Sequence, residues 1–563
     1  MNAPARPDQS PLLDIAALTL RLPAPKHGKG RELLHGVDLT VAEGETVGLV
    51  GESGSGKSLT ARSVLGLLPP RADVSGTVRL DRTDVLTAGR AQLKRLRLSA
   101  AAMIFQDPRA GINPMRTIGD HLTESLRLGE GRPRAEARAR ALELLEAVRL
   151  PDGEHHLRQY PHEFSGGMLQ RVMIAGALAG SPRLLVCDEP TTALDVTTQA
   201  QILDVLAEQR DRRGMGMLFI THDLTLASAF CDRVYVMKEG AVVEQGTASR
   251  VLRRPEHPYT QWLVAATPTI EVNGDEPGSD GSGERGSGER GSGERGSGAP
   301  APVLEVHDLA KTYQVRGRGP VRAVAGATIA VPAGEALGVV GESGSGKSTL
   351  ARMIVGLEQP DSGSVSIAGV AQTGTPRTRA ERLTHARLIQ LVFQDPYLSL
   401  DPRISVGRAV EDALRLHHPG LGTTEARSQV LGLLGQVGLV DAHAQALPRT
   451  LSGGQRQRVA IARALAIEPA VLVMDEATSA LDVSVQAQVL DVVSAIRRDR
   501  GLTVLFISHN LGVVRTVCER TVVMRSGEIV ESGRTVDLLT DPHHPYTRLL
   551  LDSVPRAEPD RVA

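Results

Sequence analysis

Short runs of apolar residues recur along the chain, and each run ends in a polar group. Residues 45–50 and 335–340 lead into glycine-rich loops, 184–189 and 471–476 end in Asp-Glu, and 217–222 and 504–509 end in histidine. Continuous apolar runs of this length are typical of buried parallel strands. Polar groups that follow such strands predict an α/β fold whose site lies at the carboxyl ends of the strands.

A second kind of pattern lies between these strands. Residues 132–148 (RPRAEARARALELLEAV) combine helical periodicity with residues of high helix propensity, and a counterpart runs from about 424 to 437. Each of these segments precedes an SGG motif. We therefore expect a helical subdomain inserted before each SGG motif.

The chain contains two copies of one unit. GESGSGKS occurs at 51–58 and again at 341–348, and the FQDP, SGG, Asp-Glu and I(T/S)H motifs recur in the same order. Between the copies, GSGER occurs three times running, a composition typical of a flexible tether, whether natural or engineered. We predict one domain over residues 12–272, a linker over 273–302 and a second domain over 303–556.

Composition excludes several classes of protein. Lys+Arg 64 against Asp+Glu 65 gives no electrostatic reason to expect nucleic acid as a partner, and 2% aromatic residues make a base-stacking platform improbable. Three cysteines cannot form a disulfide framework and fit a reducing compartment. No apolar run is long enough for a signal peptide or a membrane span, so we expect membrane association only through a partner.

The repeated glycine-rich segment has the chemistry of a phosphate loop. GxxxxGK[ST] between a strand and a helix lets backbone N–H groups curl around phosphates at the helix N-terminus. Lys57 and Lys347 are expected to reach the β- and γ-phosphates of ATP, and Ser58 and Ser348 to hold Mg²⁺. The nucleotide-binding residues predicted in the two loops are Gly51, Ser53, Gly54, Ser55, Gly56, Lys57, Ser58 and Leu59, and Gly341, Ser343, Gly344, Ser345, Gly346, Lys347, Ser348 and Thr349.

The acidic pairs at the strand ends suit hydrolysis. Asp188 and Asp475 are placed to bind the metal directly or through water. Glu189 and Glu476 follow immediately and would act as general bases for an attacking water. A pair of helix-capping carboxylates is the alternative, and the phosphate loop upstream disfavours it.

The SGG motifs predict a second anion site. A serine hydroxyl, glycine amides and a helix N-terminus can together bind an anion, although the serine alone is an ordinary helix cap. Each motif precedes a long helix and the Asp-Glu strand. The residues concerned are Ser165, Gly166, Gly167 and Met168, and Ser452, Gly453, Gly454 and Gln455.

Together these motifs resemble the ATP-binding subunits of ABC transporters over nearly the whole chain. The resemblance adds Q-loop glutamines (Gln106, Gln394), D-loops (Ala193–Asp195, Ala480–Asp482) and switch histidines (His222, His509). It implies two tandem P-loop NTPase domains of the α/β class, each with an inserted helical subdomain and an N-terminal antiparallel β part.

In that family two such domains clasp two ATP molecules head to tail. The resemblance implies that 51–58 faces 452–455 and that 341–348 faces 165–168, as an intramolecular dimer. It also implies that the glutamines link the metal and the nucleophilic water to the membrane partner, and that the histidines hold the γ-phosphate.

A tag after each copy narrows the resemblance. HPYT at 257–260 and 544–547, each followed by an apolar stretch, looks like the C-terminal extension of the oligopeptide/dipeptide/nickel importer subfamily, as do 108–115 and 396–403. This implies an ATPase on the cytoplasmic face of the membrane, bound to two permease subunits and served by an extracytoplasmic solute-binding protein. Peptides are favoured as cargo, with nickel, metallophores and glutathione open, and a soluble ABC-F-like tandem ATPase is the alternative class. Because no cysteine lies between Tyr259 and Cys518 and none follows Tyr546, no iron–sulfur cluster is expected.

Two positions depart from the family pattern. Tyr313 fits the place of the aromatic residue that stacks on adenine, whereas the equivalent residue of the first copy is Leu22, which cannot stack. Met168 replaces the glutamine present at Gln455. Both copies retain Glu and His, so neither site lacks its hydrolytic groups.

Overall fold

The computed structural model describes residues 11–23, 30–192, 194–268, 270, 301–314, 319–372, 378–395, 399–479 and 481–556. The chain forms two compact units: unit 1 mainly from residues up to Thr267, and unit 2 mainly from Pro268–Leu481 and Val485–Asp552. The expected GSGER tether lies outside the described residues, as do Ala193, Ala480 and residues 396–398. The proposed domain boundaries stay a prediction.

Each unit is built on a largely parallel six-stranded sheet. In unit 1 the strand order is β10-β9-β3-β8-β7-β6, and only the edge strand β10 is antiparallel to its neighbour. All residues of β3, β7 and β8 are buried, which explains their unbroken apolar sequences. The strands are β3 Thr46–Val50, β6 Ala101–Ile104, β7 Leu184–Asp188, β8 Gly216–Thr221, β9 Arg233–Lys238 and β10 Ala241–Thr247.

Unit 2 repeats this sheet in the order β16-β17-β18-β13-β19-β20. Its strands are β13 Ala336–Val340, β16 Ile389–Val392, β17 Val471–Asp475, β18 Thr503–Ile507, β19 Arg520–Arg525 and β20 Glu528–Arg534. In both units the predicted strands form, and the predicted glycine loops, Asp-Glu pairs and histidines lie at their carboxyl ends or within two residues of them.

The expected antiparallel β part is a separate four-stranded sheet in each unit. The orders are β2-β1-β4-β5 and β12-β11-β14-β15. The strands are β1 Leu13–Leu22, β2 Arg31–Val41, β4 Asp73–Leu80 and β5 Thr83–Asp84, and β11 Pro302–Tyr313, β12 Val321–Pro332, β14 Ser362–Ile367 and β15 Val370–Gln372.

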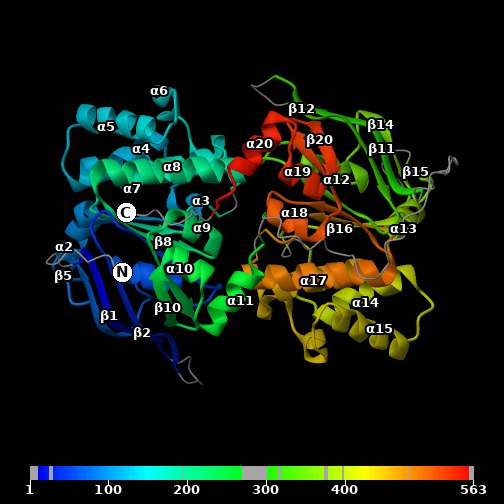
Figure 1. Cartoon of the computed structure of the whole chain (residues 1–563), viewed down its shortest axis with the longest axis horizontal. Helices are drawn as coiled ribbons and strands as arrows, with labels where there is room; N and C mark the ends of the chain where they lie inside the picture. The colour runs from blue at the N-terminus through cyan, green and yellow to red at the C-terminus, as the bar shows by residue number, and fades with distance from the viewer. Residues whose placement is uncertain are drawn as a thin grey trace, which may run out of the picture. The chain divides into compact units, whose positions relative to one another are not determined.

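The predicted helical segments become α5 (Arg134–Ala147) and α15 (Thr423–Gln436). Pro133 precedes the first helical residue of α5, consistent with a proline at a helix start. In Figure 1, α4 and α5 (cyan) lie at the end of unit 1 away from β1 and β2 (blue), and α14 and α15 lie away from β11 and β12 in unit 2. The helical subdomain and the antiparallel sheet thus occupy opposite ends of each unit.

The remaining α-helices surround the sheets. In unit 1 they are α1 Lys57–Val64, α2 Arg90–Arg95, α3 Pro108–Gly111, α4 Ile118–Glu124, α6 Gly153–His156, α7 Gly166–Leu178, α8 Val196–Arg213, α9 Leu224–Phe230, α10 Ala248–Arg253 and α11 Pro258–Ala266. The later helices are α12 Lys347–Ile354, α13 Arg379–Leu388, α14 Val406–His417, α16 Gly453–Leu465, α17 Val483–Arg500, α18 Leu511–Val517, α19 Thr535–Thr540 and α20 Pro545–Asp552. Among the described helices, none combines the length and apolar character needed to cross a membrane.

Strand β7 shows how the central sheet divides the core of unit 1. Leu185 and Cys187 belong to the apolar cluster that includes the helical subdomain, whereas Leu184 and Val186 belong to the cluster that includes the antiparallel sheet. Because side chains alternate along a strand, this one short strand packs against both the helical subdomain and the antiparallel sheet. Asp188 at its end is therefore held on a rigid element.

The cysteines lie in these packed interiors. Cys187, Cys231 and Cys518 are all buried and unpaired, and burial raises the pKa of each thiol.

Candidate active site

The phosphate loop of unit 1 wraps around its own lysine. Lys57 is 5% exposed, and its Nζ donates to the carbonyl oxygens of Gly51 at 2.7 Å and Glu52 at 2.8 Å. Burial lowers the pKa of Lys57. In unit 2, Lys347 donates to Gly341 at 2.8 Å and Glu342 at 2.7 Å. Each lysine is therefore hydrogen-bonded to backbone oxygens of the loop that is expected to bind phosphates.

The first glycine of each loop is required by close backbone approach. A Cβ on Gly51 would lie 2.2 Å from the carbonyl oxygen of Met237, and a Cβ on Gly341 would lie 2.2 Å from that of Met524. Backbone oxygens cannot move aside as a flexible side chain could. The loops run directly into α1 and α12, whose first residues are the two lysines.

A hydroxyl and a carboxylate meet beside each loop. Ser58 Oγ donates to Asp188 Oδ1 at 2.9 Å, and Ser348 Oγ donates to Asp475 Oδ1 at 3.0 Å. Burial raises the pKa of both aspartates. Hydroxyl and carboxylate oxygens are ligands that Mg²⁺ accepts when phosphates complete its coordination, so these residues fit that ion.

Glu189 stands in an unusual backbone conformation at the end of β7. Its φ is 50°, and that of Glu476 is 48°. The left-handed region costs free energy for a non-glycine residue and is enriched at functional sites. The Glu189 carboxylate accepts from Gln106 Nε2 at 2.8 Å and from Thr192 Oγ1 at 2.9 Å. Thr192 belongs to none of the sequence motifs, and only its contact with Glu189 places it in this group.

His222 completes this group in unit 1. Its Nδ1 lies 3.4 Å from Glu189 Oε1, and the two side chains are 29% and 11% exposed. Burial alone would raise the pKa of Glu189, but the hydrogen bond and charge of His222 outweigh it and lower that pKa to about 2. Burial also opposes the charge on His222, yet Glu189 raises the pKa of the imidazole. Both shifts favour the charged forms of Glu189 and His222.

Unit 2 assembles the same group. Gln394 Nε2 donates to Glu476 Oε2 at 3.1 Å and to Ser479 Oγ at 3.4 Å, and His509 Nδ1 lies 3.6 Å from Glu476 Oε2. The predicted base, glutamine and histidine thus meet in both units, from segments far apart in the sequence.

The SGG segments begin helices α7 and α16. Ser165 accepts from the backbone N–H of Met168 at 3.4 Å, and Ser452 from that of Gln455 at 3.3 Å. Only Gln455 returns a bond, accepting from the Ser452 N–H at 2.9 Å. Met168 has no group that can do so, and the cap of α7 is therefore the weaker one.

Tyr313 ends strand β11, and Leu22 ends β1. The Tyr313 hydroxyl donates to Glu358, a residue whose equivalent after the first loop is Leu68. Tyr313 and Leu22 are both partly buried. The two copies therefore differ at both members of this pair: Tyr313 and Glu358 in the second copy correspond to Leu22 and Leu68 in the first.

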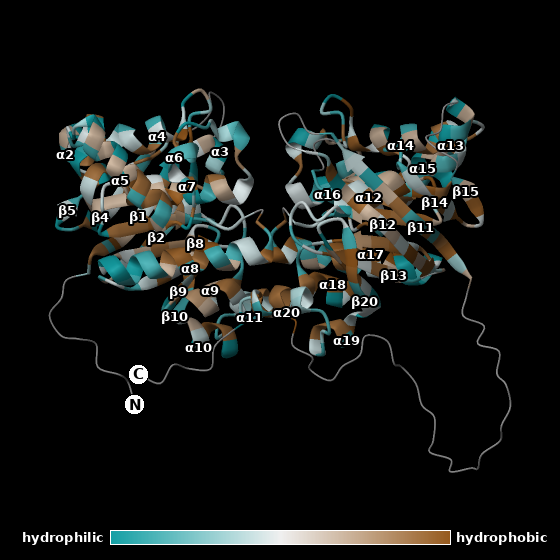
Figure 2. Ribbon diagram, turned by 90° about the horizontal axis from the view of Figure 1, so that it is seen from above, coloured by the Kyte–Doolittle hydropathy of each residue, from teal (hydrophilic) through white to brown (hydrophobic). Residues whose placement is uncertain are grey.

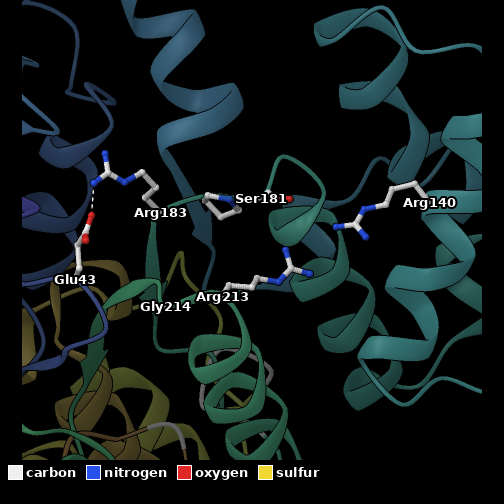
Figure 3. Close-up of a pocket in the computed structure, with 7 residues that line it drawn as sticks. Glu43, Arg140, Ser181, Arg183, Arg213 and Gly214 are labelled. Carbon is white, nitrogen blue, oxygen red and sulfur yellow. Dashed lines mark hydrogen bonds and ion pairs between the residues drawn. The ribbon is translucent and has the colours of Figure 1, made fainter.

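A cavity of about 510 Å³ in unit 1 lies away from this group (Figure 3). It opens where β7 and β8 begin, whereas the predicted site residues follow the strands' carboxyl ends. Arg183 pairs with Glu43 and Asp81, Arg140 pairs with Glu143 at 2.8 Å, and Arg213 donates to a backbone carbonyl. None of the predicted site residues lines it; its lining residues are Glu43, Arg140, Ser181, Pro182, Arg183, Arg213 and Gly214.

Comparison with protein families gives the same assignment twice in the chain. The ABC transporter model matches residues 34–192 and 324–479. The chain belongs to the ABC transporter ATP-binding family. A second model, the oligopeptide/dipeptide transporter C-terminal region, matches residues 243–288 and 530–562, which include both HPYT tags. This tandem ABC protein is therefore an ATPase of the peptide-importer type, as its motifs predicted.

Curated relatives share the tandem arrangement along nearly their full length. The peptidoglycan transport ATP-binding protein YejF of Agrobacterium fabrum is 44% identical over 524 residues, covering 92% of this chain and 91% of the relative. The glutathione import ATP-binding protein GsiA of Salmonella paratyphi A is 39% identical over 98% and 91% of the two chains. The oligopeptide transport ATP-binding protein OppD of Mycobacterium bovis is 39% identical over 98% and 100%.

Proposed function

We propose that this ABC protein hydrolyses ATP at two complete sites and energises the import of dipeptides or oligopeptides. One group of residues is repeated in both units, and this observation carries the proposal. The group contains a lysine bonded to loop carbonyl oxygens, a hydrogen-bonded Ser–Asp pair, and a glutamate that contacts a glutamine and a histidine. A unit that only bound nucleotide would need neither the base nor its partners.

The loop residues bind and orient ATP. Lys57 would reach the β- and γ-phosphates from the two carbonyl oxygens that hold it, and Lys347 would do the same in unit 2. Ser58 with Asp188, and Ser348 with Asp475, would hold Mg²⁺, and Gln106 and Gln394 would be further ligands. When bound, Mg²⁺ neutralises phosphate charge and fixes the phosphate geometry.

Glu189 and Glu476 take the proton of the attacking water. The contact with His222 lowers the pKa of Glu189, and a carboxylate of lower pKa is a weaker base. When the imidazole turns to the γ-phosphate, Glu189 loses that partner and its pKa rises. Binding of ATP thereby prepares the base that hydrolyses it.

The two SGG segments complete the sites of the opposite copies. We propose that Ser452–Gln455 meets the nucleotide on the loop 51–58, and that Ser165–Met168 meets the nucleotide on 341–348. Two helix N-termini capped by serine support this arrangement, because each offers backbone N–H groups to an anion.

We further propose that the protein lies on the cytoplasmic face of the membrane, bound to two permease subunits, and is served by an extracytoplasmic solute-binding protein. The similarity to the oligopeptide transport protein OppD supports peptide cargo, and the similarity to the glutathione import protein GsiA supports glutathione as an alternative. Nickel or a metallophore is the alternative cargo.

The test is reconstitution with permease subunits and a solute-binding protein of the peptide-importer type from the same organism. Vesicle uptake and ATP hydrolysis should rise with a binding protein loaded with a dipeptide or a longer peptide, and glutathione is a separate arm. Stimulation by Ni²⁺ or a metallophore alone would overturn peptide import. Co-purification with ribosomes but not with membranes would overturn the transport assignment.

A further inference from the structure

Each HPYT tag places a tyrosine against a phosphate loop. Tyr259, in helix α11, is 6% exposed, and its hydroxyl accepts a hydrogen bond from the backbone N–H of Glu52 at 3.2 Å. Tyr546, in α20, is 2% exposed and accepts from the N–H of Glu342 at 3.0 Å. The same contact therefore forms separately within each unit. Figure 2 shows α9, α10 and α11 gathered at one edge of unit 1.

The tyrosine and the loop lysine hold the same peptide group. The N–H of the Gly51–Glu52 peptide donates to Tyr259, and its carbonyl oxygen accepts from Lys57 Nζ at 2.7 Å. The matching peptide in unit 2 accepts from Lys347 at 2.8 Å. Because a peptide group is planar and rigid, its N–H and its carbonyl move together. Rotation of this peptide would displace the oxygen on which the lysine rests.

The rest of the tag fixes the tyrosine backbone. In unit 1, His257 Nδ1 accepts from the N–H of Tyr259 at 3.1 Å, and Glu244 on β10 accepts from the N–H groups of Glu256 and His257, both at 3.0 Å. In unit 2, His544 Nδ1 accepts from the N–H of Tyr546 at 3.1 Å. Glu531 on β20 accepts from the backbone N–H groups of His543 and His544 at 2.8 and 3.2 Å. The tag is thus tied to the edge of the sheet that carries the loop.

The ring is also held. Lys238 Nζ lies 5.1 Å from the centroid of the Tyr259 ring, and Arg525 Cζ lies 4.9 Å from that of Tyr546, within the range of cation–π attraction. Burial, with the nearby Glu52 carboxylate, raises the pKa of Tyr259. Its hydroxyl consequently stays neutral and available as an acceptor.

We propose that Tyr259 and Tyr546 are positioning residues of the two ATP sites. Each fixes the first peptide of its phosphate loop and, through it, the lysine that meets the phosphates. The C-terminal extension is therefore a working part of the ATP site, and ATP affinity falls when the tag leaves the loop. This inference rests on the proposed role of Lys57 and Lys347.

Two substitutions in the full chain test the positioning role, each measured with ATP binding at the other site blocked. Tyr259→Phe is combined with Lys347→Ala, and Tyr546→Phe is combined with Lys57→Ala. Phe keeps the ring and removes only the hydroxyl. We expect ATP to bind about three- to tenfold more weakly, the usual effect of one lost hydrogen bond. Binding of adenosine, which has no phosphates, should not change.

Tyr235→Phe is the matched control. Tyr235 is 3% exposed and its hydroxyl accepts from the backbone N–H of Thr40 at 3.3 Å, outside the phosphate loop. Unchanged ATP affinity in both tag variants would overturn the proposal, as would an equal loss in the control or a parallel loss of adenosine binding. If Lys57→Ala leaves ATP affinity at the first site unchanged, the proposed role of Lys57 in binding phosphates is wrong as well. If Lys57→Ala lowers ATP affinity but Tyr259→Phe does not, only the positioning role of the tyrosine is wrong.

Discussion

Nδ1 of His222 lies 3.4 Å from Oε1 of Glu189, so the expected γ-phosphate ligand and the expected general base form an ion pair with each other. Two groups that are expected to act at different places during hydrolysis therefore neutralise one another in this structure. The arrangement has a consequence for titration.

The histidine should titrate at higher pH because of Glu189. Burial works against both charges, but their attraction lowers the pKa of Glu189 to about 2 and raises that of His222. The stability from Glu189 is present above its ordinary value of 4.5 and is lost as pH falls toward about 2. The stability from His222 is present below its ordinary value of 6.5 and is lost as pH rises through its raised pKa.

Glu189→Gln should therefore lower the pKa of His222. The measurement is NMR of the nucleotide-free protein with labelled histidine, with the His222 resonance assigned by its disappearance in His222→Gln. An unchanged His222 titration would show that the ion pair does not form in solution.

Replacing the bases should separate hydrolysis from binding. Glu189→Gln with Glu476→Gln should slow ATP hydrolysis by about 10²–10⁴-fold, the usual contribution of a general base, while ATP binding persists. Steady-state phosphate release and equilibrium nucleotide binding measure the two quantities. Glu143→Gln, at a side chain that is 64% exposed on α5, is the control and should hydrolyse ATP normally. Normal turnover in the double variant would eliminate these glutamates as bases.

The two nucleotide sites should differ in how they hold adenine. Base–aromatic stacking is worth roughly 1–3 kcal/mol, and an aliphatic side chain still buries part of a base, so we expect a difference near the low end. Leu22→Tyr should tighten ATP at the first site, measured with the second blocked by Lys347→Ala. Tyr313→Leu should weaken ATP at the second site, measured with Lys57→Ala.

Tyr313→Phe separates stacking from the hydroxyl bond to Glu358 and should keep most of the affinity. Selectivity for ATP over GTP should also be lower at the Leu22 site. If neither Leu22→Tyr nor Tyr313→Leu changes affinity, these side chains do not stack on adenine.

The second glycine of each SGG segment should resist replacement. A Cβ on Gly167 would lie 2.6 Å from Thr198 Cγ2, and one on Gly454 would lie 1.9 Å from Val485 Cγ1, whereas nothing lies within 4 Å of a Cβ on Gly166. Overpacking of this kind costs about 1–3 kcal/mol. Denaturant unfolding should show Gly454→Ala as the most destabilised chain, Gly167→Ala next, and Gly166→Ala close to the parent. A neutral Gly454→Ala would mean that α16 and α17 can separate at no cost.

Much of the candidate site could be predicted because its motifs are local. A strand followed by a glycine loop and a lysine predicts where one helix begins. An apolar run that ends in Asp-Glu predicts where one strand ends. Ser58 and Asp188 come together because the loop and strand lie at the same edge of a parallel sheet, a property of the fold class.

Other contacts could not be predicted, because they depend on tertiary packing. HPYT indicates a helix start with a histidine cap, but nothing in four residues shows that Tyr259 reaches a loop 207 positions earlier in the sequence. The left-handed backbone of Glu189 is likewise set by the turn after β7, and its residue type gives no warning of it. The pairing of Tyr313 with Glu358 depends on the register of β11 beside the segment after α12.

The burial of all three cysteines makes the chain a suitable background for site-directed labelling. Maleimides react with accessible thiolates, whereas Cys187, Cys231 and Cys518 are enclosed and their raised pKa values keep them protonated at neutral pH. A cysteine introduced on an exposed helix face of each unit would therefore carry a fluorophore or spin label without removal of the native three. Distances between the two units during ATP turnover could then be followed in the unaltered protein core.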